Sequence, residues 1–483
     1  MKTKIYFSAV LFFSLMTMGG CKKFLDINTD PNHAADVPVT YLLSSAEGEL
    51  SFAVGNTLAI AGGVWGQYWT QNPSSSQYKL YDQYSPDAST FGNVWEVMNS
   101  DALEDMQQVI DNGKATNKPQ YVAIATILKV YTFQLSTDLW GDVPFSQALQ
   151  GKNNLSPAYD KQSDIYNGLV KMLDDAIALI NPDDPNVPGN DDLIYQGDMN
   201  LWLRFANTLK LKIGLRLSKA DPARAMSIVK SLEGKEFMGS GETGKQDFNA
   251  TGGQQNPLYG AIAGAVLGKV QNLVASSTAI GFFNGHNDPR LKAFFDPTPA
   301  GTFVGIPQGS FNAQTSGAPI SPPSAKTGAN ANNPKSASAP VILISDYESS
   351  FLQAEAVVRG WLSGDAAALY ADGIRNNFAA YGVTGVDGYL AQPDIAFPVS
   401  GSAAQTEAII TQKWAAMCGN QCIEAWTEWR RTGFPSFFVL SQGSIIGPGR
   451  FPQIFLYPAS ELTRNPKVPP QHNVFDKVWW AGN

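Results

Sequence analysis

Apolar side chains recur every three or four residues along much of this chain, which is the spacing of one face of an α-helix. Each such stripe predicts an amphipathic helix whose apolar face belongs to the core rather than to a ligand surface. The stripes run from Ile124 to Leu135, Ile165 to Leu179, Trp202 to Leu217, Tyr347 to Trp361, Tyr370 to Tyr381, and Ile410 to Met417.

Residues at the ends of these stripes carry the signals that start and stop helices. Ser163 and Asp198 precede two of the stripes and are expected to be N-caps, while Pro182 stops the helix that begins near Ser163. Gly364 and Asp365 are expected to end one helix and cap the next.

Two of the predicted helices form a pair over residues 346–381, with a tight turn at Gly364. This span of about 36 residues is close to the roughly 34-residue tetratricopeptide unit. The pairs near 88–138 and 163–217 are longer and less alike. The pattern therefore predicts an all-α fold of stacked, tetratricopeptide-like helix pairs with long irregular loops on the ligand face.

The region at about 235–345 has a different composition, rich in Gly, Ser, Asn, Pro and Thr. Within it, the stretch from Gln314 to Pro340 is nearly free of large apolar residues. Loops of this length are usually functional or disordered. We interpret the region as a loop-rich insertion in a single helical domain that covers residues 41–483.

The N-terminus has the form of an export signal. Lys2 and Lys4 precede an apolar run from Ile5 to Met18, which Gly19, Gly20 and Cys21 follow. A Cys directly after two glycines predicts a lipoprotein signal: residues 1–20 would be removed, and Cys21 would be acylated at the head of a linker over residues 21–40. A secreted protein in which Cys21 is incidental is the alternative.

Composition limits the class of protein further. The apolar fraction of 44% and the charged fraction of 16% indicate a globular chain. The formal net charge of −8 and the lack of a basic cluster argue against a nucleic-acid partner.

Cysteine and histidine are scarce. Cys418 and Cys422 form a candidate disulfide, since Gly419 and Asn420 suggest a break between them, although four-residue spacing in a straight helix strains that geometry. The three histidines lie far apart, so we expect no metal site, and nothing indicates another cofactor.

Motifs for catalysis are weak. The stretch Gly239–Gly244 matches a dinucleotide-binding fingerprint, but no strand–turn–helix pattern surrounds it and Gln246 replaces the Ser or Thr of a P-loop. No nucleophile elbow or zinc-protease helix occurs. Nothing marks the facing carboxylates of a glycosidase, so the chain is not expected to be an enzyme.

Aromatic residues interleaved with amides and hydroxyls are the best candidates for sugar contacts, because sugars stack on aromatic faces and bond to amides. Polar residues interrupt the first group, so not all of its rings are expected to be core, although Trp65 and Trp69 could form one buried stripe. The ligand-binding candidates are Trp65, Tyr68, Trp69, Asn72, Tyr78, Tyr81 and Tyr84, and, in a second stretch, Asn284 and His286. Asp288 and Arg290, which follow that stretch, are expected to form a structural turn.

Six blocks carry a resemblance to a known family. They are Lys22–Asn32, Thr137–Phe145, Ala354–Gly360, Glu424–Gly433, Tyr457–Glu461 and Val478–Trp480. In this order, and over nearly the whole mature chain, they resemble the SusD/RagB family of outer-membrane nutrient-binding lipoproteins, in its SusD-like branch. Met18, the Cys418 and Cys422 pair, and the loop around 300–340 depart from that pattern.

The resemblance implies a non-enzymatic lipoprotein, anchored in the outer membrane and facing the cell surface. Such a protein captures an oligosaccharide or polysaccharide and passes it to a SusC-type TonB-dependent transporter. Two alternatives stay open: a SusD-like protein that binds peptides, and a helical-repeat scaffold that binds only protein partners.

Overall fold

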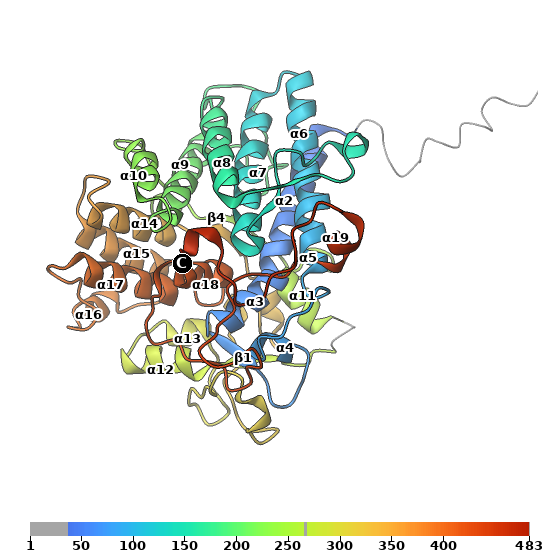
Figure 1. The fold of residues 1–483 in the computed structure, drawn as a ribbon. Coiled ribbons are helices and arrows are strands. Elements are labelled where there is room, and N and C mark those ends of the chain that lie inside the picture. The colour runs from blue at the N-terminus through green and yellow to red at the C-terminus, as the bar shows by residue number, and fades with distance from the viewer. Residues whose placement is uncertain (1–36, 265–267, 483) are drawn as a thin grey trace, which may run out of the picture.

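A computed structural model describes residues 37–264 and 268–482 of the chain. Long helices and a few short strands make up the molecule, which confirms the predicted all-α class (Figure 1). The proposed signal peptide, Cys21 and most of the predicted linker lie outside the described residues. The first described helix, α2, begins at Val39, two residues before the expected domain boundary.

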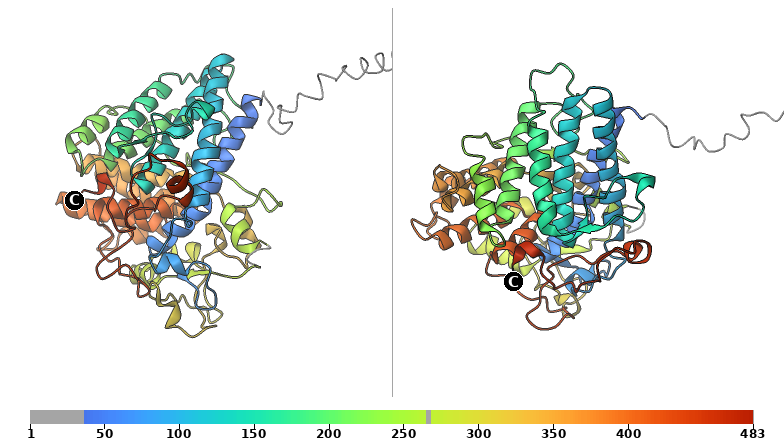
Figure 2. Two further views of the ribbon diagram at one scale, coloured as in Figure 1. Left: turned by 45° about the vertical axis from the view of Figure 1, so that its right-hand side comes forward. Right: turned by 45° about the horizontal axis from the view of Figure 1, so that its top comes forward.

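Six helices form a row in which each contacts the next, and Figure 2 shows the longest of them standing side by side. They are α2 (Val39–Gly55), α6 (Leu103–Ala115), α7 (Pro119–Trp140), α8 (Gln162–Ile177), α9 (Met199–Arg216) and α10 (Pro222–Lys230). Between α2 and α6 lie α3 (Thr57–Trp65), α4 (Lys79–Asp82), α5 (Gly92–Glu96) and the π-helix η2 (Val97–Ala102).

A second group of helices contacts this row through α9 and α14. It contains α14 (Asp346–Val358), α15 (Ala366–Ala380), α16 (Val386–Leu390), α17 (Ser402–Ala416) and α18 (Cys422–Thr432). Helices α14 and α15 are the pair predicted over residues 346–381. Asp365 caps α15 as expected, because its carboxylate accepts the N–H groups of Ala367 and Ala368.

The cap at Asp198 is also observed, since its side chain accepts hydrogen bonds from Asn200 and Leu201. The cap predicted at Ser163 is wrong. Helix α8 begins one residue earlier, at Gln162, and the N–H of Gln162 is bound by Asp142 Oδ1 at 3.0 Å. A carboxylate twenty residues upstream thus does what a local cap would do.

The described parts of the region, residues 235–264 and 268–345, contain only short elements, as the composition predicts. They are β4 (Gly244–Gln246), α11 (Pro257–Ala263), β5 (Leu273–Ala275), α12 (Ser277–Gly285), α13 (Leu291–Phe294), η4 (Ser310–Asn312), η5 (Ala325–Thr327), η6 (Pro334–Ser338) and β6 (Val341–Ile344). Strand β4 pairs antiparallel with β6, and β5 with β1 (Trp69–Gln71). A third pair joins β2 (Val143–Pro144) to β3 (Tyr159–Asp160).

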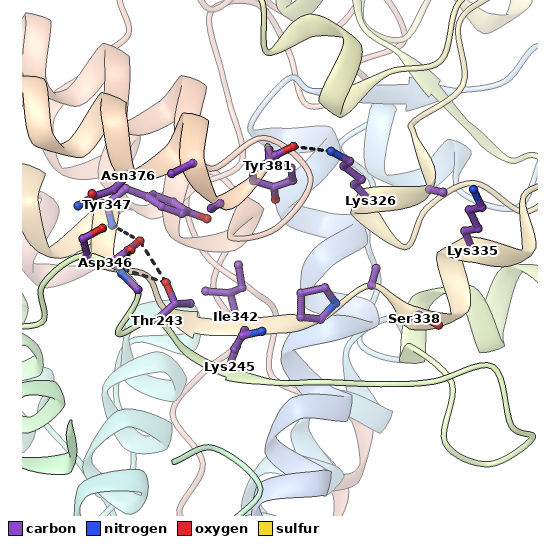
Figure 3. Close-up of a pocket in the computed structure, with 17 residues that line it drawn as sticks. Thr243, Lys245, Lys326, Lys335, Ser338, Ile342, Asp346, Tyr347, Asn376 and Tyr381 are labelled. Atoms are coloured by element: carbon purple, nitrogen blue, oxygen red, sulfur yellow. Dashed lines mark hydrogen bonds between the residues drawn. The ribbon is translucent and has the colours of Figure 1, made fainter. Parts of the chain in front are cut away.

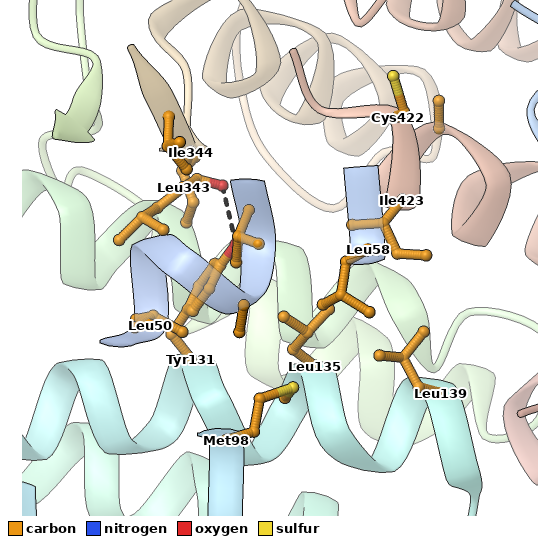
Figure 4. Close-up of a cluster of buried hydrophobic side chains, with 14 of the residues drawn as sticks. Leu50, Leu58, Met98, Tyr131, Leu135, Leu139, Leu343, Ile344, Cys422 and Ile423 are labelled. Carbon is orange, nitrogen blue, oxygen red and sulfur yellow. Dashed lines mark hydrogen bonds between the residues drawn. The ribbon is translucent and has the colours of Figure 1, made fainter. Parts of the chain in front are cut away.

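The main hydrophobic core lies where α2, α3, α7, α18 and β6 meet (Figure 4). Leu58, Leu135, Leu343 and Ile423 are buried there, and the Tyr131 hydroxyl donates to the Leu343 carbonyl at 3.2 Å. Helix α7 is buried on nearly every side, so it is a central helix of the core.

The last described element, η7 (Trp479–Ala481), closes this core from the C-terminus. Trp480 is fully buried, and its ring stacks beside the guanidinium groups of Arg216 at 5.3 Å and Arg430 at 4.9 Å. The C-terminal segment therefore completes the packing around two buried cations. The remaining short elements are η3 (Gly151–Asn153) and α19 (Ala459–Arg464).

Two consecutive glycines allow helix α3 to pack closely. A Cβ on Gly62 would lie 2.2 Å from the backbone nitrogen of Ile423, so only glycine lets α3 touch α18. A Cβ on Gly63 would lie 2.2 Å from the ring of Trp69. The absence of a side chain at both positions therefore allows α3 to contact α18 and Trp69 directly.

Buried charges join five of the helices. The carboxylates are Asp138, Glu348, Glu355, Glu424 and Glu428, and the cations among them are Lys212, Arg216, Lys413 and Arg431. Burial alone would raise the pKa of Glu428, but Arg431, Lys413 and Arg216 outweigh it and hold that pKa well below its usual value. The network therefore keeps its charges inside the protein.

Candidate functional site

The aromatic residues proposed from sequence as sugar platforms lie in the core. All six rings are buried: Trp65, Tyr68, Trp69, Tyr78, Tyr81 and Tyr84. The inference that some of them must be exposed is wrong. Trp65 and Trp69 are both buried, as the alternative had it, but they do not form one helical stripe, because Trp65 ends α3 and Trp69 begins β1. Trp65 packs against Trp426 with ring centroids 4.9 Å apart, and Tyr68 stacks on Trp414 at 5.0 Å.

The polar residues between these rings explain why so polar a stretch is buried. Asp82 Oδ2 accepts the Gln71 N–H at 2.6 Å and the Thr70 hydroxyl at 2.8 Å. The Gln71 side chain in turn accepts the N–H of Tyr78 at 2.6 Å. These amides and hydroxyls satisfy the segment's own polar groups instead of a ligand.

The other predicted contacts are dispersed. Asn72 is engaged with the backbone, because its Nδ2 donates to Gln271 O at 2.7 Å and its Oδ1 accepts the Ser74 N–H. Asn284 is exposed on α12, and His286 at the end of that helix packs against Phe282 with the two rings tilted by 41°.

The turn expected at Asp288 and Arg290 is observed, and the two side chains form a buried ion pair of 2.6 Å within it. The Arg290 guanidinium also donates to Gln412 at 2.8 Å. Cys418 and Cys422, proposed as a disulfide, are both buried free thiols in this structure. Burial raises the pKa of both, that of Cys422 to about 12, so neither is poised to react as a thiolate.

A cavity of about 550 Å³ lies between the loop-rich region and the α14–α15 pair (Figure 3). Its walls come from the turn before β4, from β6, from η5 and η6, from the start of α14 and from the end of α15. The lining residues are Ser240, Gly241, Thr243, Lys245, Ala325, Lys326, Lys335, Ser338, Ala339, Pro340, Ile342, Asp346, Tyr347, Asn376, Ala379, Ala380 and Tyr381.

Asp346 forms one end of this cavity. Its Oδ2 accepts the Gly241 N–H at 2.8 Å, and its Oδ1 accepts the Thr243 hydroxyl at 3.1 Å and the Tyr347 N–H at 2.7 Å. The carboxylate lies in the first turn of α14, where the helix dipole also stabilises it. It is committed to holding the turn 239–243 against the helix.

Two buried tyrosines lie in the wall of the cavity. The Tyr347 hydroxyl donates to Asn420 Oδ1 at 2.8 Å, and Asn420 Nδ2 donates to the Tyr381 hydroxyl at 2.6 Å. Burial raises the pKa of both phenols far above neutral pH, so both stay uncharged. One amide thereby fixes the two rings relative to each other.

Three lysines surround the same opening, as Figure 3 shows. Lys245 extends from β4 and pairs with Asp247 at 2.8 Å. Lys326 extends from η5 and donates to the carbonyl oxygen of Tyr381. Lys335 lies on η6 and is exposed. The site therefore combines cationic and hydroxyl donors with apolar surface, which is the mixture that a polar ligand with an apolar face requires.

The cavity uses the glycine-rich stretch singled out in the sequence, but not as a nucleotide motif. Gly241 and Thr243 hold Asp346, and the stretch leads into strand β4 rather than opening a helix. It therefore lacks the helix N-terminus that would hold a phosphate.

The described residues include no cluster of three or more His, Cys, Asp or Glu side chains placed to hold a metal ion. No helix among them is both long enough and apolar enough to cross a bilayer.

Comparisons with known proteins agree on one family. Residues 31–458 match the SusD-like family model described as "Starch-binding associating with outer membrane". No sequence among the curated proteins matches the chain. Among solved structures, a SusD homolog from Bacteroides uniformis is 25% identical, with a TM-score of 0.79 over 92% of this chain and 100% of that one.

Two further structures are described as chitin-binding. One, a chitin-binding protein, is 26% identical and has a TM-score of 0.74 over 91% of this chain and 100% of its own. The other, a chitin-binding SusD homolog from Flavobacterium johnsoniae, is 23% identical and has a TM-score of 0.76 over 92% of this chain and 98% of its own. With most of its length matched by the family model, the chain belongs to the SusD-like family of starch-binding proteins that associate with the outer membrane.

Proposed function

We propose that this protein is a lipid-anchored glycan-binding protein of the bacterial cell surface. It captures an oligosaccharide and delivers it to a SusC-type TonB-dependent transporter in the outer membrane. The family match over residues 31–458 carries this proposal. The export signal that ends at Cys21 supports the anchor.

The cavity beside α14 and α15 is the proposed ligand site. Its volume of about 550 Å³ falls in the usual range for small-molecule sites. The exposed Ala379 and Ala380 supply apolar surface, while Asn376, Thr243 and the lysines supply groups that bond to hydroxyls.

Binding without turnover is part of the proposal. Glycosidases in most families need two carboxyl groups that face each other across the bond to be cut. Among the described residues that line the cavity, Asp346 is the one carboxylate, and three donors already hold it.

The test is to screen the mature protein on a glycan array and titrate the hits by calorimetry. Ala380→Trp places a large side chain at an exposed position of the cavity wall and should abolish binding. Ala368→Trp, at an exposed position on the same helix outside the cavity, should bind like the wild type.

Three results would contradict the proposal. If Ala380→Trp binds glycan as well as the wild type, the cavity is not the ligand site. If reducing ends are released from a bound glycan, the protein is not a non-enzymatic binder. Binding to peptides but to no glycan would favour the peptide-binding alternative instead.

A further inference from the structure

A second, smaller cavity adjoins the proposed ligand site. Its volume is about 370 Å³, and Lys326 and Tyr381 line both cavities. Lys326 Nζ donates to the backbone carbonyl of Tyr381, so this contact lies on the boundary between the two spaces. Together they offer room for a chain of several units rather than for one sugar.

Lysines line both cavities, and they come from separate elements. Lys292 of α13 lines the smaller cavity, Lys335 of η6 lines the larger one, and Lys326 of η5 serves both. Element η5 contacts both α13 and η6, so the three lysines follow neighbouring segments. Their grouping is a product of the fold, since Lys292 and Lys335 are 43 positions apart in the chain.

Carboxylates do not balance these charges. Lys245 is paired with Asp247, whereas Lys292, Lys326 and Lys335 form no ion pair with a carboxylate within residues 37–264 and 268–482. Asp346, the lining carboxylate, is already held by Gly241 and Thr243. Lys326 uses one of its three ammonium protons on Tyr381 and keeps two donors for a ligand.

This local excess of positive charge contrasts with the formal net charge of −8 for the whole chain. A protein of that charge repels polyanions in general. The positive charge of these lysines is therefore local, on a protein that has no broad basic surface.

Building on the proposed function, we infer that the two cavities bind one acidic oligosaccharide. Its carboxylate or sulfate groups pair with Lys292, Lys326 and Lys335, while its sugar rings lie against the exposed Ala379 and Ala380 of α15. Ammonium-to-anion hydrogen bonds are about twice as strong as neutral ones, so they would set the preference for acidic chains.

Two matched pairs of probes test this inference by calorimetry on the mature protein. Oligogalacturonate is compared with its carboxyl-reduced form, and dextran sulfate fragments are compared with neutral dextran fragments. The acidic member of at least one pair should bind more tightly, and added salt should weaken that binding. Which pair responds distinguishes carboxylate from sulfate.

The variant Lys326→Gln/Lys335→Gln should lower affinity for the acidic probe about tenfold or more. Lys152→Gln, at an exposed lysine of η3 outside both cavities, should leave the affinity unchanged. Lys326, Lys335 and Lys152 are all exposed, so the melting temperature of both variants should stay near that of the wild type.

Equal binding of both members of each pair, or an unchanged affinity in the double variant, overturns the acidic-ligand inference while leaving glycan capture intact. Tighter binding of a polyglutamate peptide than of any acidic glycan also overturns it. The absence of binding to every glycan, neutral or acidic, overturns the proposed function itself.

Discussion

The Arg431 guanidinium donates to both carboxylate oxygens of Glu355, from Nη1 to Oε1 at 2.7 Å and from Nη2 to Oε2 at 2.6 Å. Both side chains are buried, and the pair fastens α18 to α14. Arg431 also contacts Glu428 at 2.6 Å, so the same cation joins two carboxylates. Helix α14 also provides a wall of the ligand cavity, and this pair therefore fixes the helix on which Asp346 and Tyr347 lie.

Glu355→Gln should destabilise the protein by about 3–5 kcal/mol, because it leaves a buried guanidinium without its main counter-charge. Chemical denaturation followed by circular dichroism measures the change. Glu236→Gln, which removes one partner of an exposed pair with Arg204, should change stability by less than about 1 kcal/mol. Equal losses of stability in the two variants would mean that burial does not determine how much an ion pair contributes to stability here.

Trp65→Ala should cost about 3–5 kcal/mol of stability, since the ring is buried against Trp426 and Phe455. Trp479→Ala, at a half-exposed ring, should cost much less. Thermal melting of both variants gives the comparison. A Trp65→Ala variant that loses glycan binding at unchanged stability would restore the platform role proposed from sequence.

Gly62→Ala should destabilise the protein by about 1–3 kcal/mol or more, because the added methyl meets the backbone of α18. Gly281→Ala, at an exposed helical glycine with nothing within 4 Å of its Cβ position, should raise stability slightly through helix propensity. The denaturant midpoint should fall below that of the wild type in Gly62→Ala and rise above it in Gly281→Ala. Shifts in the same direction would contradict the prediction.

Burial raises the pKa of Asp82 from 3.8 to about 6, although hydrogen bonds from Gln71, Thr70 and Gln308 oppose the rise. Between these two values the unfolded chain has released a proton that the folded protein keeps, so rising pH favours unfolding. Above pH 6 the loss from this group amounts to about 3 kcal/mol, at about 1.4 kcal/mol per pKa unit.

Asp82→Asn removes that titration. The free energy of unfolding of the wild type should therefore fall relative to that of the variant as pH rises from about 4 to about 6, and run parallel to it at higher pH. Urea titrations at several pH values measure both curves. Parallel curves throughout that range would show that Asp82 does not titrate as described.

Cys21→Ala should move the protein from the outer-membrane fraction to the soluble fraction, since acyl chains bind membranes at about 0.8 kcal/mol per buried methylene. The measurement is fractionation followed by immunoblotting in a strain without the transporter. Retention of the variant in the membrane of that strain would contradict the lipid anchor.

Local signals in the sequence predicted the helical architecture well. The caps at Asp198 and Asp365 depend on hydrogen bonds to residues two or three positions away, so their spacing alone reveals them. The start of α8 was missed because its partner, Asp142, is twenty residues upstream. Such distant partners leave no periodic signal.

The candidate site was less accessible to sequence reasoning, because its residues are brought together only by the fold. Lys245 and Tyr381 are 136 positions apart, and the stripe that contains Tyr381 indicated core alone. Aromatic residues between polar ones predict a sugar platform, but here Asp82 and Gln71 bond to the segment's own polar groups. Gly62 and Gly63 were the overlooked sign that this segment packs tightly.

The position of Trp480 bears on when the protein can fold. This ring covers Arg216 and Arg430, which lie 264 and 50 positions earlier in the chain. Folding can begin while synthesis continues, but here a segment made well after α9 and α18 completes their packing. Until it arrives, the cations of α9 and α18 keep water around them. Complete removal of water from these two cations therefore waits for the C-terminal segment.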